Sequence, residues 1–271
     1  MEQRSLFTTD TRRWGQLFTT LALALTAGVT ADAQPVREAI AAGDRAYALH
    51  DAPGALASYE RAAAADTLNY EAAWKASRSA ADLERRRRGA ANHTVLLQTA
   101  ESYARRAVAL RPDRPEGHFA LARGLGVAAR SRGVRDRVRY AGDVRHHALE
   151  CLRHDASHSG CLHIMGAWNA EVMRLSGVER FVARRLLGGR AFGSASWSEA
   201  IRYMEAAVAA APHRIVHRVE LAEIYEESGR VADAKREYQA ALALAVDDFN
   251  DPFYKSGAQA GLDRMNRLTQ P

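Results

Sequence analysis

Residues Val219–Leu244 read V-E-L-A-E-I-Y-E-E-S-G-R-V-A-D-A-K-R-E-Y-Q-A-A-L-A-L, and this stretch decides the fold class. Leu221, Ala222 and Tyr225 recur at helical spacing on one face, Gly229 interrupts the run, and helical spacing then resumes. The stretch therefore predicts two helices joined by a tight turn. Small residues lie where these helices would cross, and aromatic residues lie where a neighbouring hairpin would pack.

The order L-A-x-x-Y, G, A-x-x-x-Y-x-x-A resembles the tetratricopeptide repeat, whose period is about 34 residues. Its small-residue position recurs at Ala62, Ala107, Cys151, Ala207 and Ala241, in steps of 45, 44, 56 and 34 residues. The first three steps exceed the bare period by 11, 10 and 22 residues. Because one hairpin cannot bury its apolar face alone, we predict about five helical pairs stacked as a solenoid.

The rest of the chain agrees with an all-α class. Hydrophobic residues make up 47% of the 271 positions but aromatic residues only 7%, a composition that suits closely crossed helices better than strands. The largest insertion, around residues 176–198, contains a helical stretch at 178–187. A final helix from Asp251 to about Leu268 is predicted to cover the apolar end of the stack.

The first 33 residues have the pattern of an export signal. Arg12 and Arg13 precede the apolar run Leu17–Val29, and Ala31-Asp32-Ala33 follows as a small-x-small cleavage site. The apolar run spans roughly 20 Å as a helix, whereas a bilayer core is ~30 Å thick. We therefore expect a signal peptide at 1–33, a repeat domain at 34–271, export to the periplasm or medium, and no stable transmembrane segment after cleavage.

Four stretches resemble the regulator of microtubule dynamics family of tetratricopeptide-like proteins. These are Glu71–Leu83 (E-A-A-W-K-A-S-R-S-A-A-D-L), His118–Val127 (H-F-A-L-A-R-G-L-G-V), His163–Arg180 (H-I-M-G-A-W-N-A-E-V-M-R-L-S-G-V-E-R) and Ser196–Val208 (S-W-S-E-A-I-R-Y-M-E-A-A-V). The resemblance covers roughly residues 35–264 and includes the insertion, which ordinary repeat proteins lack.

This resemblance implies the same helical fold. Animal members are linked to microtubules, and one branch to organelle contact sites and phospholipid binding. The fourth unit of the family usually reads G-R-W, whereas this chain has Gly166-Ala167-Trp168, so no role of that arginine is carried over. An exported chain would not meet tubulin.

The concave face of such a stack is lined by the first helix of each unit, and it is the usual binding surface. Arginine there offers a planar fork for carboxylate or phosphate, and the aromatic residues offer apolar contact. Alternatively, the aromatic residues are core packing and the arginines cover their edges. The repeat register predicts the following residues in the groove: Trp74, Arg78, Phe119, Arg123, His163 and Glu171, together with Ala170, Val219 and Glu223.

Charge is spread unevenly along the chain. Residues 81–153 hold 16 arginines against 8 acids, while residues 199–271 hold 12 acids against 9 basic residues. The run Arg85–Arg88, expected in a loop, suits an acidic partner or lipid headgroups, or is simply solvated. Nucleic acid is disfavoured because the basic region lacks interleaved aromatic residues or a known recognition module.

Histidines and cysteines gather in one segment. His146, His147, His154, His158 and His163 have no recognised zinc spacing with cysteines, so we expect no metal site. The two cysteines, Cys151 and Cys161, would form a disulfide after export if their Cα atoms come within about 4.4–6.8 Å. Otherwise each is a compact apolar filler in a packing position.

No motif for catalysis is present: the sequence has no G-x-S-x-G, H-E-x-x-H or P-loop. We therefore expect a non-enzymatic scaffold without catalytic residues or cofactors, which binds a protein or peptide, an acidic one included, in its concave groove. The alternative from another class is a carrier of lipid or a small amphiphile in an arginine-lined groove. An enclosed apolar cavity would favour the carrier, and an open groove of mixed charge would favour the scaffold.

Overall fold

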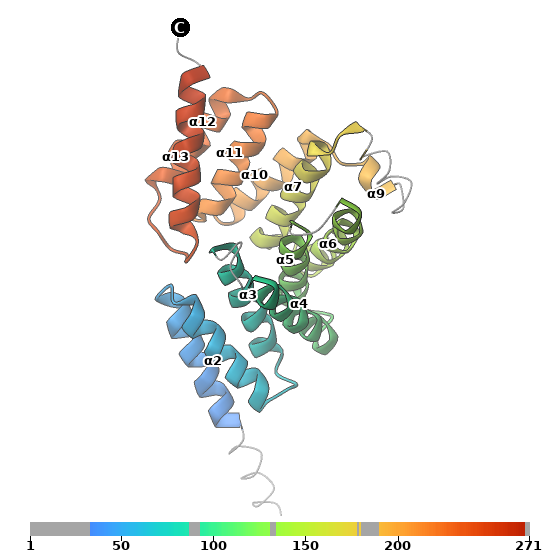
Figure 1. Cartoon of the computed structure of the whole chain (residues 1–271), viewed down its shortest axis with the longest axis vertical. Helices are drawn as coiled ribbons and strands as arrows, with labels where there is room; N and C mark the ends of the chain where they lie inside the picture. The colour runs from blue at the N-terminus through green and yellow to red at the C-terminus, as the bar shows by residue number, and fades with distance from the viewer. Residues whose placement is uncertain (1–32, 87–92, 131–133, 178, 180–189, 269–271) are drawn as a thin grey trace, which may run out of the picture.

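The computed structural model describes residues 33–86, 93–130, 134–177, 179 and 190–268, and every regular element within these ranges is a helix (Figure 1). The predicted all-α class is confirmed. The helices cover residues 33–48, then α2 (Ala52–Ala65), α3 (Tyr70–Arg86), α4 (His93–Leu110), α5 (Pro115–Arg130), α6 (Val134–His154), α7 (Ser159–Arg174), α9 (Arg190–Gly193), α10 (Trp197–Ala210), α11 (Ile215–Glu227), α12 (Val231–Ala243) and α13 (Asp251–Leu268).

Two predicted segments lie largely or wholly outside these ranges. Of the expected signal peptide only residue 33 is described, and of the expected inserted helix at 178–187 only residue 179. Within the part of the chain that the structure describes, no helix is both long enough and apolar enough to cross a membrane.

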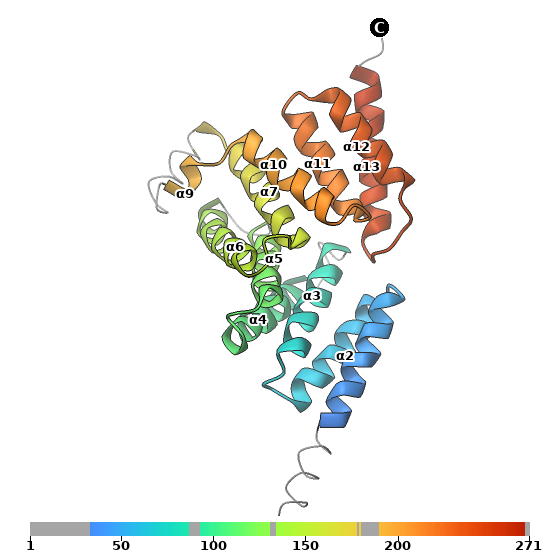
Figure 2. The ribbon, with the colours of Figure 1, turned by 180° about the vertical axis from the view of Figure 1, so that it is seen from behind.

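The helices pair as five hairpins, as the repeat spacing predicts. The helix at 33–48 packs Val36 and Ile40 against Ala62 and Ala63 of α2. The other pairs are α3 with α4, α5 with α6, α7 with α10 and α11 with α12. Seen from behind, the stack climbs from the first hairpin through α3–α6 to the last helices at the opposite end (Figure 2). A helical hairpin solenoid is therefore present.

Local chemistry sets the helix ends. The Asp51 carboxylate accepts a hydrogen bond from the Gly54 backbone N–H at 3.0 Å and caps α2, with a proline in its first turn. The Ser196 hydroxyl caps α10 in the same way through the Glu199 N–H. Gly229 has φ +81°, a left-handed conformation that stops α11 and turns the chain into α12.

The packing follows the register of the small-residue position. Ala62, Ala107, Cys151, Ala207 and Ala241 are all 0% exposed, each on the second helix of its hairpin. A side chain of this size lets two helices approach closely, so a larger one would force them apart. The insertions therefore lengthen helices and connections without disturbing the crossing points.

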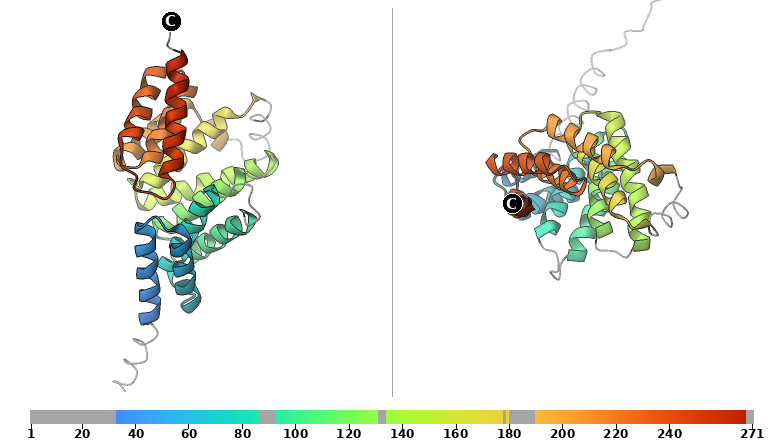
Figure 3. Two further views of the ribbon diagram at one scale, coloured as in Figure 1. Left: turned by 60° about the vertical axis from the view of Figure 1, so that its left-hand side comes forward. Right: turned by 90° about the horizontal axis from the view of Figure 1, so that it is seen from above.

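The last helix packs against its neighbours in the stack, and the loop before it packs against the first hairpin. Tyr254, Ala258 and Met265 of α13 belong to the same apolar cluster as α11 and α12, which confirms the predicted cap on the end of the stack. The loop before α13 instead packs Phe249 against the apolar cluster of the first hairpin and α3. The views agree that the start of α13 lies next to the turn of the first hairpin (Figures 1 and 3). The solenoid thus bends far enough for its two ends to meet.

Candidate ligand-binding cavity

A cavity of about 470 Å³ lies on the concave side of the solenoid. Its walls come from α3, α5, α6, α7 and α11, from Phe192 in the insertion, and from the segment 248–254 that joins the two ends. This volume falls in the range of small-molecule sites.

One wall is apolar. Phe119, Val127, Val144, Ile164 and Trp168 line it, and Phe192 packs its ring 5.6 Å from that of Trp168. The Trp168 Nε1–H donates to the Ala141 carbonyl at 2.8 Å, so its polar atom is satisfied and the ring serves as an apolar surface. The wall offers contact area to apolar groups.

Gly160 sets the position of Phe119 in this wall. A Cβ atom at residue 160 would lie 2.4 Å from the Phe119 ring, so only glycine lets α7 approach α5 so closely. The Phe119 ring also lies 4.9 Å from that of His158.

The opposite side is a charged rim centred on Asp82, which is 2% exposed. Its carboxylate accepts a hydrogen bond from the Arg123 guanidinium at 2.5 Å and one from the Tyr47 hydroxyl at 3.3 Å. The Asn250 amide donates to the Asp82 main-chain carbonyl at 3.3 Å. A buried carboxylate of this kind needs its partners, so the three contacts hold three distant elements together.

A second ion pair continues the rim. The Arg214 guanidinium donates to the buried Asp248 carboxylate at 3.0 Å. Burial alone would raise the pKa of Asp248, but Arg214 and the Asn250 backbone N–H outweigh it and hold that pKa below the usual range. The joining loop is therefore tied to α11 as well as to α3.

Two arginines of the rim have no carboxylate partner within ion-pair distance among the described residues. Arg78 lies over the Tyr47 ring at 3.6 Å and donates to the Tyr59 hydroxyl at 3.4 Å, and its Nε is buried without a partner. Arg85 lies over the Tyr254 ring at 5.0 Å. With Arg123 and Arg214, four arginines and two aspartates form this rim, and the other two carboxylates of the cavity lining are Glu171 and Glu220.

A histidine pair forms a third part of the lining. The Nδ1 atoms of His163 and His217 are 3.0 Å apart, and the Glu220 carboxylate lies 3.2 Å from His163 Nε2. One Nδ1 must donate and the other accept, so at least one imidazole is neutral. Burial first, and then His163 and Arg214, lower the pKa of His217 to about 2. His217 is therefore the neutral partner.

Five of the six principal predicted groove residues line this cavity: Arg78, Phe119, Arg123, His163 and Glu171. Trp74 does not. Its half-buried ring lies against the central apolar cluster, with the Arg78 guanidinium 5.1 Å from its centroid. Arg123 does line the cavity, but its fork is already engaged by Asp82, so it is not free for a ligand.

Of the other three residues predicted in the groove, the predictions for Ala170 and Val219 are wrong. Ala170 and Val219 are 0% and 2% exposed in the core between α7, α10 and α11, and Glu223 does not line the cavity. On α11 the lining residues are Val216, His217 and Glu220, which differ from the positions that an ideal repeat predicts.

The sequence did not indicate Asp82, Arg214, Asp248 and Asn250 as cavity residues, and it indicated Arg85 only as part of a basic run. The run Arg85–Arg88 was expected in a loop, but Arg85 and Arg86 belong to the last turn of α3, and residues 87 and 88 lie outside the described ranges. No sequence signal pairs Asp82 with Asn250, which is 168 positions away.

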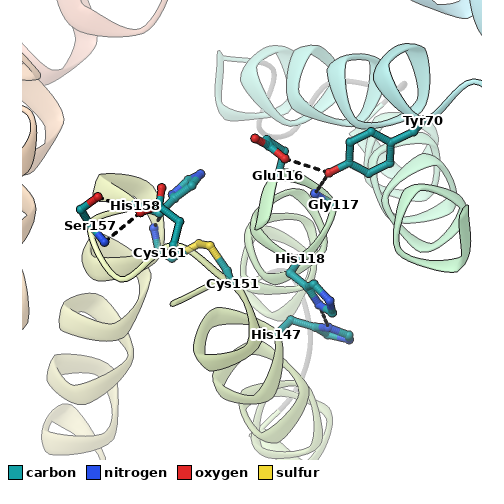
Figure 4. Close-up of a disulfide and its surroundings, with 10 residues drawn as sticks. Tyr70, Glu116, Gly117, His118, His147, Cys151, Ser157, His158 and Cys161 are labelled. Carbon is teal, nitrogen blue, oxygen red and sulfur yellow. Dashed lines mark hydrogen bonds between the residues drawn. A yellow bond between two sulfur atoms is a disulfide. The ribbon is translucent and has the colours of Figure 1, made fainter. Parts of the chain in front are cut away.

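The two cysteines form a disulfide with a Cα–Cα distance of 6.3 Å (Figure 4). The bond joins the end of α6 to the start of α7, and the enclosed turn carries His158 and Gly160, which line the cavity. A covalent link here reduces the freedom of that turn in the unfolded chain.

Comparisons with known proteins agree with this architecture. The family model described as "Regulator of microtubule dynamics protein 1-3" matches residues 39–266. No curated protein matches the chain. A thermophilic TPR protein of Thermus thermophilus is 21% identical with a TM-score of 0.58, covering 84% of this chain and 99% of that chain. The structure of MamA protein is 15% identical with a TM-score of 0.43, covering 79% and 98% respectively. The likeness to the Thermus protein shows the shared tetratricopeptide fold.

Proposed function

This chain belongs to the regulator of microtubule dynamics family, and from its solenoid and cavity we propose that it is a non-enzymatic scaffold that holds a peptide segment of a partner protein in its concave face. Tetratricopeptide stacks are interaction folds, and their concave face is the usual binding surface. The ligand would be a short segment with apolar side chains next to an acidic one.

The observation that carries this proposal is the division of the cavity into an apolar wall and a cationic rim. The wall around Phe119 and Trp168 takes apolar side chains, and the rim has two more arginines than aspartates. Arg78 and Arg85 are the anchors for a carboxylate, because Arg123 and Arg214 are already paired. A bidentate arginine contact with a carboxylate contributes about 1.5–3 kcal/mol as a charged hydrogen bond.

The proposal is tested by screening a library of short peptides for binding and titrating the strongest by fluorescence anisotropy. Arg78→Met should weaken binding about tenfold, since loss of 1.4 kcal/mol is a factor of ten, and Phe119→Ala should also weaken it. Arg105→Met is the matched control, because Arg105 pairs with Glu101 on α4 and does not line the cavity. Equal affinities of all these variants for the peptide would contradict the proposal.

A second function, carriage of a lipid or small amphiphile, is favoured by the extent of the apolar wall and by its enclosure between Phe119, Trp168 and Phe192. An amphiphile would place its chain against this wall and its anionic head at the arginine rim. Mass spectrometry of an organic extract of the purified protein distinguishes the two. A stoichiometric lipid favours the carrier, whereas an empty extract together with peptide binding favours the scaffold.

We further propose that the scaffold acts outside the cytoplasm. The support is the apolar run Leu17–Val29 with its small-x-small site, together with two cysteines that are positioned to form a disulfide. Disulfides persist in oxidising compartments. The partner would then be another exported or surface protein.

A further inference from the structure

The third hairpin carries three potential metal ligands within 4.8 Å of one another, His118, Glu150 and His154, and a fourth, His147, whose Nδ1 lies 3.0 Å from that of His118. His118 comes from the first turn of α5, and His147, Glu150 and His154 come from the last turns of α6. His118 is 5% exposed, and none of the four lines the cavity. Figure 4 shows the rings of His118 and His147 directed toward each other from the two helices.

The hydrogen bonds of His118 determine where its lone pair lies. Its Nε2 is 3.0 Å from the Pro112 carbonyl oxygen, which can only accept, so Nε2 carries the proton. Its Nδ1 therefore presents a lone pair, and it lies 3.0 Å from Nδ1 of His147. A histidine that ligates a metal almost always donates its other N–H to a carbonyl or carboxylate in the same way.

The spacing of the two Nδ1 atoms suits a shared metal ion. Zinc–nitrogen bonds of about 2.0–2.1 Å in a tetrahedral site place two ligand nitrogens roughly 3.3 Å apart. The observed separation of 3.0 Å needs only a small opening. His147 can change tautomer, placing its proton on Nε2 and its Nδ1 lone pair toward the metal.

Glu150 and His154 supply the remaining ligands. A ring nitrogen of His118, a ring nitrogen of His154 and a carboxylate oxygen of Glu150 lie within 4.8 Å of one another. At present Arg153 donates to Glu150 at 2.6 Å and to His154 Nε2 at 3.1 Å, so a cation already occupies these acceptors. The Arg153 side chain is 63% exposed, and surface contacts of this kind contribute little, so a metal ion displaces it at low cost.

We propose that His118, His147, Glu150 and His154 form a binding site for a divalent transition-metal ion, of which zinc is the expected occupant. Three imidazoles and one carboxylate match the nitrogen and oxygen ligands that zinc prefers, whereas magnesium and calcium require mainly oxygen. The ion would clamp the start of α5 to the end of α6. The nearby cysteines are not ligands, because both sulfur atoms are in the disulfide.

Zinc titration by calorimetry tests the site, with the full-length chain, no polyhistidine tag and no reductant. Wild type should bind one zinc ion and gain in melting temperature, and EDTA should reverse both effects. His147→Gln and His154→Gln should each weaken zinc binding at least tenfold. His118→Gln should do the same, but His118 is buried, so the two more accessible variants carry the conclusion if it fails to fold. His213→Gln, an exposed histidine between α10 and α11, is the matched control.

Cobalt substitution gives a second readout. The cobalt protein should show ligand-field bands of a nitrogen and oxygen site without a thiolate charge-transfer band. Zinc affinity equal in wild type, His147→Gln and His154→Gln overturns the proposal, as does the absence of zinc binding. A thiolate band would also overturn it, because it would place the ion at the reduced cysteines.

Discussion

The side-chain amide of Asn250 donates a hydrogen bond to the main-chain carbonyl of Asp82 across 168 residues of sequence. This contact joins the segment before the last helix to the end of α3. Because Asp82 also pairs with Arg123 of α5, a single buried carboxylate relates the beginning, the middle and the end of the solenoid. The cavity is bounded by this contact on one side.

Asn250→Ala should lower the free energy of unfolding by about 1 kcal/mol, because a buried carbonyl and carboxylate lose a donor. Gln259→Ala is the control, since among the described residues Gln259 donates only to Asp263, in an exposed contact on α13. Urea denaturation monitored by circular dichroism measures both. An equal loss in the two variants would mean that the contact between the ends contributes nothing.

Arg123 and Arg78 should respond differently to substitution, although the repeat register treats them as equivalent. Arg123→Met leaves Asp82 buried without its ion-pair partner, a change that costs about 3–5 kcal/mol in buried pairs. Since Arg123 is 24% exposed, we expect the lower part of that range. Arg78→Met should cost less, because Arg78 has no carboxylate partner within ion-pair distance among the described residues. Urea denaturation of both variants measures the two losses in free energy of unfolding. A larger loss for Arg78→Met than for Arg123→Met would contradict our assignment of Arg78 as the arginine that is free to bind a ligand.

Ala234→Leu should destabilise the protein by about 1–3 kcal/mol through overpacking. Ala234 is 0% exposed and lies one 34-residue period after Ala200, which is also 0% exposed. Ala232→Leu is the matched control, because Ala232 is exposed on the same helix. The melting temperature should fall in Ala234→Leu and not in Ala232→Leu. An equal shift in both variants would show that helix propensity, not packing, is responsible.

The pH dependence of stability should carry opposite contributions from His217 and Glu223. Burial first, and then His163, lower the pKa of His217 to about 2, so below about pH 6.5 the unfolded chain takes up a proton that the folded chain does not. Stability from this residue is therefore lost as pH falls. Burial first, and then Glu220, raise the pKa of Glu223 to about 7. The folded chain keeps that proton between about pH 4.5 and 7, so stability from Glu223 is lost as pH rises.

Denaturation in EDTA between pH 4.5 and 6.5 measures both effects. Compared with wild type, His217→Gln should flatten the fall in stability toward acid by about 1.4 kcal/mol per pH unit, the value for one proton. Glu223→Gln should make that fall steeper. Parallel curves for the three proteins would contradict the assignment of neutral, buried forms.

The exported form should begin at or near Gln34. The apolar run and the Ala31-Asp32-Ala33 site predict cleavage there. Cell fractionation followed by N-terminal sequencing of the purified protein measures it. An uncleaved cytoplasmic product would remove the basis for export and would leave open partners inside the cell.

The sequence by itself determined the helices, their pairing and the crossing points. The cap at Asp51, the turn at Gly229 and the recurring small residues from Ala62 to Ala241 are local features, set by hydrogen bonds and packing within a few helical turns. The resemblance to the family also rests on short stretches of sequence, such as Glu71–Leu83 and His163–Arg180. Local spacing also placed Arg78, Phe119 and His163 on the concave face, because the first helix of each hairpin faces inward in this fold.

Only the tertiary structure decided which side chains meet. Asn250 reaches Asp82, and His118 reaches His147, because the rotation between successive hairpins and the insertions accumulate along the stack. A small change in register moves Val219 into the core and His217 into the cavity lining. Such rotations depend on the packing of whole helices, and the spacing of residues within one helix does not encode them.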